Sequence, residues 1–351
     1  MIMVPIQGRR VLLIGGAGFI GHNLALHLKK AGAEVSIIDG LQVNNMLALL
    51  SENINVGNRE LYMAMINQRI ALLRHAKIPM FVQDARDYHK LSQLISQIKP
   101  QTVVLLAAVA HAGRSNKDPF NTFDHSFRTL ENSLDACRGS IEHFIFFSSS
   151  MVYGNFPDGI ATEETICNPI GIYGALKLGG EKLVIAYNQV FGLPYTIVRP
   201  SALYGERCVS RRVGQIFIEN ALQDQDLVIR GDGSERLDFT YISDLAQGIK
   251  RVIENENSRN QIFNLTYGSG RSVADMIGIL KDRFPKLNVK TLPRDELSPE
   301  RGTLSVEKAK ALLGYEPSFP LEKGMEKYIE WYKHFFAKYN EQIAEESQIY
   351  E

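Results

Sequence analysis

The sequence predicts an α/β fold, with a doubly wound parallel sheet and a smaller C-terminal α/β domain. Three observations support this prediction. Short apolar runs alternate with helical stretches, a glycine motif follows the first run, and the chain after about residue 200 is richer in Gly, Pro and charge. Short, continuously apolar runs are typical of parallel strands buried on both faces, and their alternation with helices is typical of βαβ units. A chain of 351 residues accommodates two average domains, or one large domain with an appendage.

Composition narrows the class of protein before any motif is considered. Lys plus Arg and Asp plus Glu both number 39, so the formal charge is zero and no broad basic surface for nucleic acid is expected. The three cysteines include no CxxC pair, which predicts no metal site and a reduced, cytoplasmic location. No apolar stretch reaches the roughly 18 residues of a membrane helix, so no membrane segment is expected.

Strands and helices are assigned from apolar periodicity. Arg10–Ile14 is predicted to be a strand, His22–Ala31 a helix that ends near Gly32, and Glu34–Asp39 a second strand. The same reasoning predicts further strands at Pro79–Val82, Thr102–Leu106, His143–Ser148 and Tyr195–Val198. Two later runs are expected to return to the main sheet, Phe239–Tyr241 and Ile262–Leu265.

A glycine motif, Gly15-Gly-Ala-Gly18-Phe-Ile-Gly21, joins the first strand to its helix. Gly15 and Gly18 allow a tight turn and a close backbone approach to a pyrophosphate, and Gly21 allows the helix to pack closely on the strand. The helix N-terminus offers free amide groups and a partial positive charge to phosphates. The motif alone is weak evidence, but here an acid follows at the end of the next strand.

Asp39 is that acid, 18 residues beyond Gly21. A carboxylate at this position accepts hydrogen bonds from the adenosine ribose and repels a 2′-phosphate, which favours NAD over NADP. Asp84, after the strand that ends at about residue 82, is expected to meet the adenine. The alternative for Asp39 is an ordinary aspartate in the turn after a strand.

A tyrosine, a lysine and a serine are the candidate catalytic residues. Tyr173 and Lys177 are four residues apart, on one face of a predicted helix. The lysine and an oxidised nicotinamide both favour the phenolate, so Tyr173 can take a proton from a sugar hydroxyl while hydride leaves the same carbon. Ser149, at the end of a predicted strand, can hydrogen-bond the reacting oxygen. A surface Tyr–Lys pair, and serines that only cap the turn, are the alternatives.

Six segments of the chain occur in the order found in one enzyme family. They are GGAGFIG at 15–21, Leu106-Ala-Ala108, SSSMVYG at 148–154, YGALK at 173–177, RPSALYG at 199–205 and DFTYISD at 238–244. Together with the late segment 300–317, they resemble the NAD-dependent epimerase/dehydratase family of extended short-chain dehydrogenases over residues 9–333. The resemblance implies a Rossmann-type domain, a smaller substrate domain, and a tightly held NAD that is reduced and reoxidised within one turnover.

The resemblance also implies roles for single residues. The catalytic trio becomes Ser149, Tyr173 and Lys177. The implied NAD contacts are Gly15, Gly18, Phe19, Ile20, Gly21, Asp39, Asp84, Ala85, Leu106, Ala107, Ala108, Tyr173, Lys177 and Pro200. The expected partners of a nucleotide-sugar substrate are Ser149, Ser150, Arg114, Arg207 and Arg301.

The candidate substrate arginines have different expected roles. Arg207 and Arg301 would bind phosphate through charge-assisted hydrogen bonds, and the weaker candidates for this role are Arg211, Arg212 and Arg236. Arg114 would face the sugar together with His111 and Ser115. A solvated surface position is the alternative for each phosphate-binding candidate, and capping of a loop is the alternative for the segment around Arg114.

The domain boundaries are set by the motifs and the change in texture. We expect an NAD-binding domain over 1–199 with 237–266 returning to it, a substrate-binding domain over 200–236 and 267–335, and a polar, partly disordered tail over 336–351. Residues 42–78 interrupt the strand–helix alternation, and one or two helices that cover a sheet edge are predicted there. A lid or a subunit contact is the alternative for this segment.

The family resemblance also bears on assembly and on the reaction. It implies a homodimer joined by a four-helix bundle from residues near 120–137 and 173–191. Ser150-Met151 stands where dehydratases usually carry an Asp-Glu pair, and Ala202 and Leu237 replace an Asn and an Arg that help hold substrate. We therefore expect a nucleotide-sugar 4-epimerase that works through a transient 4-keto intermediate. A dehydratase, reductase, dehydrogenase or decarboxylase of the family is the alternative, and a non-catalytic NAD-binding sensor or scaffold is the distant one.

Overall fold

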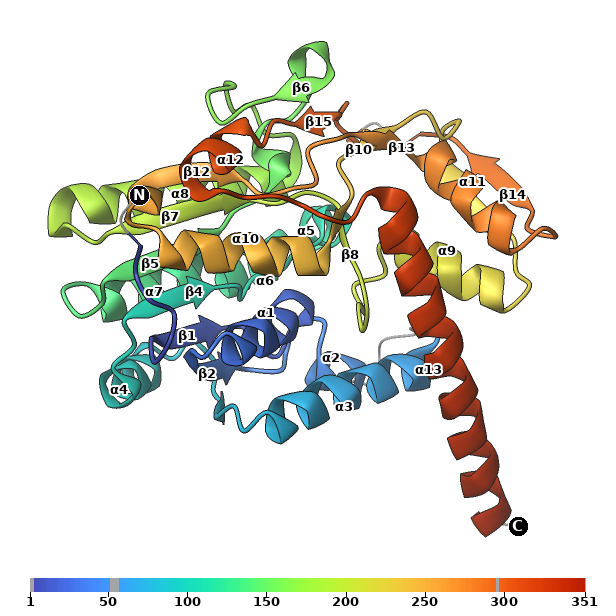
Figure 1. Cartoon of the computed structure of the whole chain (residues 1–351), viewed down its shortest axis with the longest axis horizontal. Helices are drawn as coiled ribbons and strands as arrows, with labels where there is room; N and C mark the ends of the chain where they lie inside the picture. The colour runs from blue at the N-terminus through green and yellow to red at the C-terminus, as the bar shows by residue number, and fades with distance from the viewer. Residues whose placement is uncertain (1–2, 51–56, 295–296, 351) are drawn as a thin grey trace.

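The fold is built on a parallel sheet whose strands alternate with helices (Figure 1). The computed structural model describes residues 3–50, 57–294 and 297–350. Within them, seven strands form the main sheet in the order β12-β7-β5-β4-β1-β2-β3, and every neighbouring pair is parallel. Their bounds are β1 Arg10–Ile14, β2 Glu34–Asp39, β3 Met80–Val82, β4 Thr102–Leu105, β5 His143–Phe147, β7 Tyr195–Arg199 and β12 Gln261–Asn264. The predicted Rossmann-type sheet is confirmed.

The strand order reverses between β1 and β4. From β1 the chain continues through β2 to β3 on one side, and from β4 through β5 and β7 to β12 on the other. Loops that leave β1 and β4 at their carboxyl ends therefore diverge and leave a crevice, which is where open α/β sheets bind their ligands.

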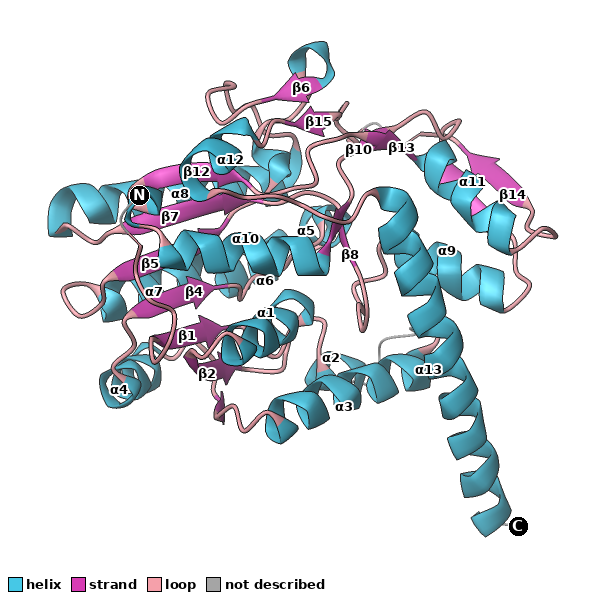
Figure 2. Ribbon diagram, in the orientation of Figure 1, coloured by secondary structure: helices cyan, strands magenta, loops and turns pink. Residues whose placement is uncertain are grey.

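Alternating side chains of β1 pack into separate cores on the two faces of the sheet. Val11 and Leu13 join a core with α1 (Phe19–Lys30), α3 (Arg59–His75) and α10 (Ile242–Glu254). Leu12 and Ile14 join a second core with α4 (Tyr88–Ile98), α7 (Thr129–Cys137) and α8 (Gly171–Phe191). This period-two burial requires helices on both faces, and Figure 2 shows them there.

The smaller C-terminal region is made of short strands and helices. Its elements are β9 Leu227–Arg230, β10 Arg236–Leu237, β13 Arg271–Ser272, β14 Val289–Leu292, α9 Val213–Leu222 and α11 Val273–Arg283. β9 pairs with β14 in parallel, and β10 pairs with β13 in an antiparallel ladder. Residues 303–313 lie elsewhere: β15 (Thr303–Leu304) pairs with β6 (Ile160–Ala161), and α12 (Glu307–Leu313) packs beside β12 and α10.

Two sequence-based expectations need correction. β11 (Thr240–Tyr241) does not return to the main sheet, because it pairs with β8 (Leu203–Tyr204) in a separate two-stranded sheet. The segment 336–351 was expected to be a partly disordered tail, yet α13 (Leu321–Tyr350) continues through it as one helix. Aromatic side chains spaced along α13, among them Trp331, Phe335 and Tyr339, contact one another and carry the apolar pattern past residue 336.

The interrupting segment 42–78 forms helices, as predicted. α2 (Met46–Leu50) and α3 lie there, while residues 51–56 are outside the described part. α3 packs on α1 and extends toward α13 (Figure 1). The helices expected near 120–137 and 173–191 are α6 (Pro119–Phe123), a π-helical segment (Asp124–Arg128), α7 and α8.

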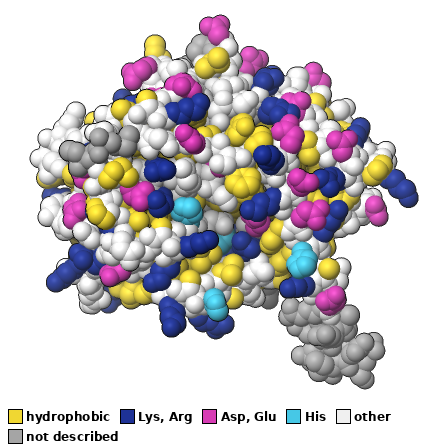
Figure 3. Space-filling view, in the orientation of Figure 1, with side chains coloured by type: hydrophobic (Ala, Val, Ile, Leu, Met, Phe, Trp, Pro, Cys, Tyr) yellow, Lys and Arg dark blue, Asp and Glu magenta, His cyan; other side chains and the backbone are white. Residues whose placement is uncertain are grey.

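Charge is evenly mixed on the visible surface. On the face drawn in Figure 3, Lys and Arg side chains are interspersed with Asp and Glu. Across residues 3–50, 57–294 and 297–350, no helix has the length and apolar character needed to cross a membrane.

A buried ion pair ties β7 to α8. Arg199 donates from Nε and Nη2 to both carboxylate oxygens of Glu181, at 2.8 and 2.6 Å, and both side chains are almost fully buried. Ser148 donates to the same carboxylate at 2.5 Å. These bonds compensate for the desolvation of both charges.

We predict that Arg199→Met lowers the free energy of unfolding by about 3–5 kcal/mol, because it leaves the Glu181 carboxylate buried without its cation. Urea denaturation measures this change. The matched control is Arg283→Met, which removes an exposed ion pair with Glu326 and should cost less than about 1 kcal/mol. Equal losses in the two variants would contradict the prediction.

Candidate active site

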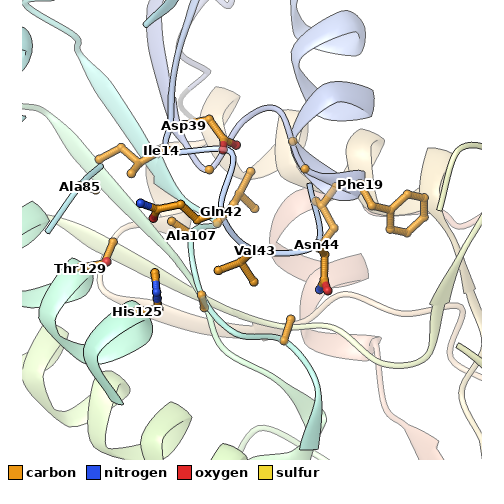
Figure 4. Close-up of a pocket in the computed structure, with 18 of the residues that line it drawn as sticks. Ile14, Phe19, Asp39, Gln42, Val43, Asn44, Ala85, Ala107, His125 and Thr129 are labelled. Carbon is orange, nitrogen blue, oxygen red and sulfur yellow. The ribbon is translucent and has the colours of Figure 1, made fainter. Parts of the chain in front are cut away.

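A cleft lies at the carboxyl ends of β1, β2 and β4, where the strand order reverses. Its lining residues are Ile14, Gly15, Gly18, Phe19, Ile20, Gly21, Ile38, Asp39, Gly40, Gln42, Val43, Asn44, Gln83, Asp84, Ala85, Leu106, Ala107, Ala108, Ala110, His125, Thr129, Leu203, Ser210 and Arg212. Figure 4 shows Asp39 and Gln42 near the end of β2, and His125 and Thr129 across from them. All but Tyr173, Lys177 and Pro200 of the predicted NAD contacts line this cleft.

Three of the four glycines of the motif, Gly15, Gly18 and Gly21, occupy their positions for different structural reasons. Gly15 has φ +84°, and a Cβ there would lie 2.5 Å from the backbone nitrogen of Ala107, so only glycine fits against β4. A Cβ on Gly21 would lie 2.5 Å from Cα of Gly16, so a side chain there would collide with the backbone of the glycine turn. Gly18 has φ −71°, and a Cβ there would meet only the carbonyl oxygen of Gly15, at 3.4 Å. The protein itself thus leaves room at Gly18, on the wall of the cleft.

Asp39 is fixed at the end of β2. One carboxylate oxygen accepts from the backbone N–H of Ala17 at 2.9 Å, and the other accepts from that of Leu41 at 2.8 Å. Burial raises the pKa of this carboxyl, and the two N–H groups partly offset the rise. The acid therefore joins the glycine turn to the next loop and still faces the cleft.

Asp84 lies in a polar network at the same end of the cleft. It pairs with Arg86 at 2.6 Å and accepts from Gln42 at 2.9 Å, and Arg86 also pairs with Asp124. Burial opposes ionisation of Asp84, but these hydrogen bonds prevail and lower its pKa to about 2. The carboxylate is ionised and oriented at neutral pH.

Ser149, Tyr173 and Lys177 come together beside the cleft. Tyr173 and Lys177, both on α8, line a small hollow together with Ala107 and Ala108, which also line the main cleft. Ser149 follows β5, its hydroxyl accepts from the backbone N–H of Met151 at 3.2 Å, and it lies close enough to the Tyr173 phenol to lower the pKa of that group. The serine, the phenol and the lysine thus meet next to the predicted dinucleotide site.

The charges around the phenol differ from the simple sequence-based picture. Burial raises the pKa of Tyr173, and Arg212 is the cation that lowers it. The Lys177 ammonium instead donates to the carbonyl of Phe147 at 2.6 Å and lies 5.1 Å from the centre of the Phe146 ring. Burial lowers the pKa of Lys177 to about 8, against the opposing effect of Glu181.

The candidate substrate arginines do not all reach this place. Arg212 lines the cleft and donates to the carbonyl of Ala110 at 3.2 Å. Arg301 is close enough to Arg212 for the two charges to interact, and its pairing with Glu235 is long, at 3.5 Å. Within the described residues its buried Nε has no hydrogen-bond partner. Arg207 points elsewhere: it donates to His22 at 3.2 Å and stacks on the Trp331 ring.

The remaining candidates lie around the edges of the site. Arg114 is exposed on α5 (Ala112–Lys117), where His111 accepts from its backbone N–H at 3.3 Å as the helix cap. Ser150 is buried, and its N–H donates to the carbonyl of Pro200 at 3.0 Å. Arg236 donates to the carbonyl of Gly270.

Sequence reasoning missed several lining residues. Gln42, Val43 and Asn44 lie in an irregular loop after β2, where apolar periodicity carries no signal. His125 and Thr129 lie in or just after the π-helical segment before α7, and π-helical turns are frequent at functional sites but have no sequence signature. The sequence favours Arg207 over Arg212 for binding phosphate, because spacing alone does not tell which arginine of the 203–213 segment turns inward.

The fold and site define a dinucleotide-binding α/β protein with a Ser–Tyr–Lys group beside the cleft. The sequence profile of the NAD dependent epimerase/dehydratase family matches residues 11–266. The chain therefore belongs to this family, whose members are nucleotide-sugar epimerases, dehydratases and related enzymes.

Individual relatives are similar over nearly their whole lengths. A putative UDP-glucose 4-epimerase of Methanocaldococcus jannaschii is 30% identical over 331 residues, which cover 92% of this chain and 98% of the relative. An uncharacterized UDP-glucose epimerase of Bacillus subtilis is 29% identical, with 90% and 95% covered. The UDP-glucuronic acid 4-epimerase of Bacillus cereus, solved with UDP-glucuronic acid and NAD, has a TM-score of 0.81 at 26% identity, with 93% and 99% covered.

We predict that Gly18→Ala weakens NAD binding and leaves the fold intact, because the added methyl group fits the protein but enters the space at the cleft wall. Affinity for NAD measured by calorimetry should fall at least about tenfold, which corresponds to about 1.4 kcal/mol, with thermal stability unchanged. The control is Gly278→Ala on α11, where a Cβ meets nothing within 4 Å. Unchanged affinity in Gly18→Ala would show that the pyrophosphate does not approach this glycine.

We predict that Lys177→Met stabilises the fold at neutral pH. The Lys177 ammonium is charged in both states below its folded-state pKa of about 8, so folding carries the full cost of burying it there. Between pH 8 and 10.5 the folded state loses this proton first, and the cost disappears. The free energy of unfolding of Lys177→Met should therefore exceed that of the wild type by up to about 3 kcal/mol at pH 7, and by much less near pH 10. Urea unfolding over this pH range measures the difference, and a pH-independent difference would contradict the assigned shift.

Proposed function

We propose that the protein is an NAD-dependent nucleotide-sugar 4-epimerase. One observation carries the proposal: Tyr173 and Lys177 line a hollow that shares Ala107 and Ala108 with the proposed dinucleotide cleft, and Ser149 lies close to the Tyr173 phenol. The names of relatives at 25–30% identity, which include UDP-glucose and UDP-glucuronate 4-epimerases, support the same reaction class.

The cleft fits NAD in three of its features. Space remains beside Gly18 for a pyrophosphate, the Asp39 carboxylate faces the cleft, and the first turn of α1 contains no acidic residue that would repel phosphate. Asp39 would hold the adenosine ribose, and Tyr173 and Lys177 would lie at the nicotinamide end. The chemistry that bound NAD supplies is reversible hydride transfer at a sugar carbon.

The protein would supply proton transfer and orientation. Tyr173 would take the proton of the sugar C4 hydroxyl through its phenol oxygen and later return it, while the Ser149 hydroxyl would hydrogen-bond the same sugar oxygen. The positive charge of Arg212 would stabilise the phenolate, and Lys177 would hold the nicotinamide ribose. The 4-keto sugar would turn over in the site and be reduced on its opposite face.

The substrate would bind through its diphosphate on the arginine side of the cleft. The charges of Arg212 and Arg301 interact, and neither side chain makes a short ion pair in the described part of the chain. A diphosphate would satisfy both guanidinium groups through charge-assisted hydrogen bonds. UDP-glucose and UDP-glucuronate are the first probes, because relatives are named for them.

We further propose a homodimer through the α6 and α8 face. Large apolar side chains are exposed on these two helices, namely Phe120, Phe123, Ile172, Val190 and Phe191. α6 and α8 pack side by side, so these residues belong to neighbouring helices. A second copy of the chain would remove them from water in a bundle of helices.

We predict that Tyr173→Phe lowers turnover of the UDP-sugar at least about 100-fold, as expected for loss of a general acid–base group, while the bound NAD content stays the same. NMR of the sugar protons, without added NADH, follows the reaction. Tyr187→Phe, on the same helix, is the control and should retain activity. Full activity in Tyr173→Phe would rule out the proposed mechanism.

The product distinguishes this reaction from others of the family. An isomer of unchanged mass, formed with no net NADH, supports the 4-epimerase. Loss of water or carbon dioxide, or stoichiometric NADH release, assigns the protein to the dehydratases, decarboxylases or dehydrogenases instead.

A further inference from the structure

The loop Gly205–Arg212, between β8 and α9, carries Arg212 into the cleft in an unfavourable backbone conformation. Arg207 and Arg211 have φ of +62° and +54°, in the left-handed region that side chains other than glycine seldom adopt. Such conformations persist only where surrounding contacts hold them. Several elements contact this loop, and α3 is connected to it near both ends.

We propose that α3 is a positioning element for the substrate, because it fixes both ends of the loop that presents Arg212. The inference rests on the proposed function, in which Arg212 binds the substrate diphosphate. It assigns a role to the helix that interrupts the strand–helix alternation, and it names Tyr62 and Arg69 as the residues through which that helix acts.

The first attachment is made by Arg69. Its side chain is fully buried, and its Nε and Nη2 both donate to the carbonyl oxygen of Arg207, with an Nε–O distance of 2.9 Å. Among the described residues, no carboxylate forms an ion pair with this guanidinium, and its Nη1 has no partner. Burying a charged guanidinium that bonds a single carbonyl oxygen costs free energy. We take this cost as a sign that the contact serves to fix the backbone of Arg207.

The second attachment runs through two buried side chains of α9, the amide of Gln215 and the carboxylate of Glu219. The backbone N–H of Arg211 donates to Oε1 of Gln215 at 2.9 Å, and Nε2 of Gln215 donates to Glu219 at 2.9 Å. Tyr62 on α3 donates its hydroxyl to the same carboxylate at 2.7 Å, and Asn58, just before α3, donates to it at 3.1 Å. Glu219 thereby connects α3 to the end of the loop.

The two attachments come from one face of α3. Tyr62 and Arg69 are seven residues apart, which is close to two helical turns. The rigid helix therefore sets the distance between the two points at which it holds the loop. On the far side, Tyr332 of α13 also donates to Glu219 at 2.7 Å, and Trp331 lies under Arg207, so α3 and α13 enclose the loop.

The position of Arg212 follows from that of its neighbour. Arg211 is held through Gln215 and the next residue enters the cleft, where Arg212 bonds the carbonyl of Ala110. Loosening of the Glu219 connection would let Arg212 move relative to the diphosphate. The proposed NAD contacts Gly15, just after β1, and Asp39, at the end of β2, lie outside this chain of hydrogen bonds, although Asp39 interacts with the charge of Arg69.

The test is Tyr62→Phe, which removes one hydroxyl from the connection and keeps the ring. The KM for UDP-glucose or UDP-glucuronate should rise about fivefold or more, as expected for one lost hydrogen bond to a charged group, while kcat changes less than about twofold. Bound NAD should stay at the wild-type level. Arg69→Lys, which keeps the charge but lacks the paired donors, should raise KM in the same way.

The matched control is Tyr315→Phe. This tyrosine is equally buried, and its hydroxyl donates to the carbonyl of Thr266, away from the loop. It should leave KM unchanged even if both variants lose the same stability. Equal KM values for Tyr62→Phe and Tyr315→Phe would overturn the proposal.

Hydrogen exchange separates this proposal from the proposed function. If the wild type converts none of the UDP-sugars, the amide exchange rates of residues 205–212 still decide the role of α3. Faster exchange in Tyr62→Phe than in Tyr315→Phe would support the positioning role without any turnover, and equal rates would overturn it.

Discussion

The close approach of β1 and β4 at their carboxyl ends is the constraint on which the rest of the site depends. Gly15 and Ala107 leave these strands so near each other that a single methyl group on Gly15 cannot be placed. Because the segments that follow β1 and β4 then diverge in opposite directions, a crevice opens between them. Asp39 closes one end, and its bonds to Ala17 and Leu41 fix it to the same turn.

A second buried network holds the other side of the site. Glu181, one turn beyond Lys177 on α8, binds Arg199 of β7 and the hydroxyl of Ser148 at the end of β5. The strand that leads to Ser149 and the helix that carries Tyr173 and Lys177 are thereby tied to one carboxylate. Burying these charges costs desolvation, and the arrangement keeps the Ser149 hydroxyl close to the Tyr173 phenol although the two come from different elements.

The sequence was informative wherever chemistry depends on local spacing. Glycines, the acid that ends β2, and a tyrosine four residues before a lysine are local patterns, and the structure brings them to one cleft and the small hollow beside it. The main-sheet strands were found because buried parallel strands are continuously apolar. β11 was misplaced because two residues have no period, and its partner β8 is set by tertiary packing. The helix at 336–350 was missed because its aromatic spacing was outweighed by its polar composition.

Side-chain direction in irregular segments was beyond sequence reasoning. Arg207 and Arg212 are both basic residues of one loop, and only left-handed φ angles at Arg207 and Arg211 turn one toward Trp331 and the other into the cleft. Local propensity does not favour these angles. Contacts from α3 and α13 impose them. Each helix is more than 100 residues from the loop in the sequence, α3 before it and α13 after it.

The charge distribution of the cleft suggests why such bracing is needed. The charges of Arg212 and Arg301 repel each other, and among the described ion pairs only the long contact between Arg301 and Glu235 offsets that repulsion. Two guanidinium groups without full compensation would separate if their loops were free, because each gains hydration by moving apart. A loop held at both ends keeps them together before any ligand arrives. In the proposed function a diphosphate would bridge the two guanidinium groups. The free-energy cost of holding them together would already have been met during folding, so it would not be subtracted from the binding affinity.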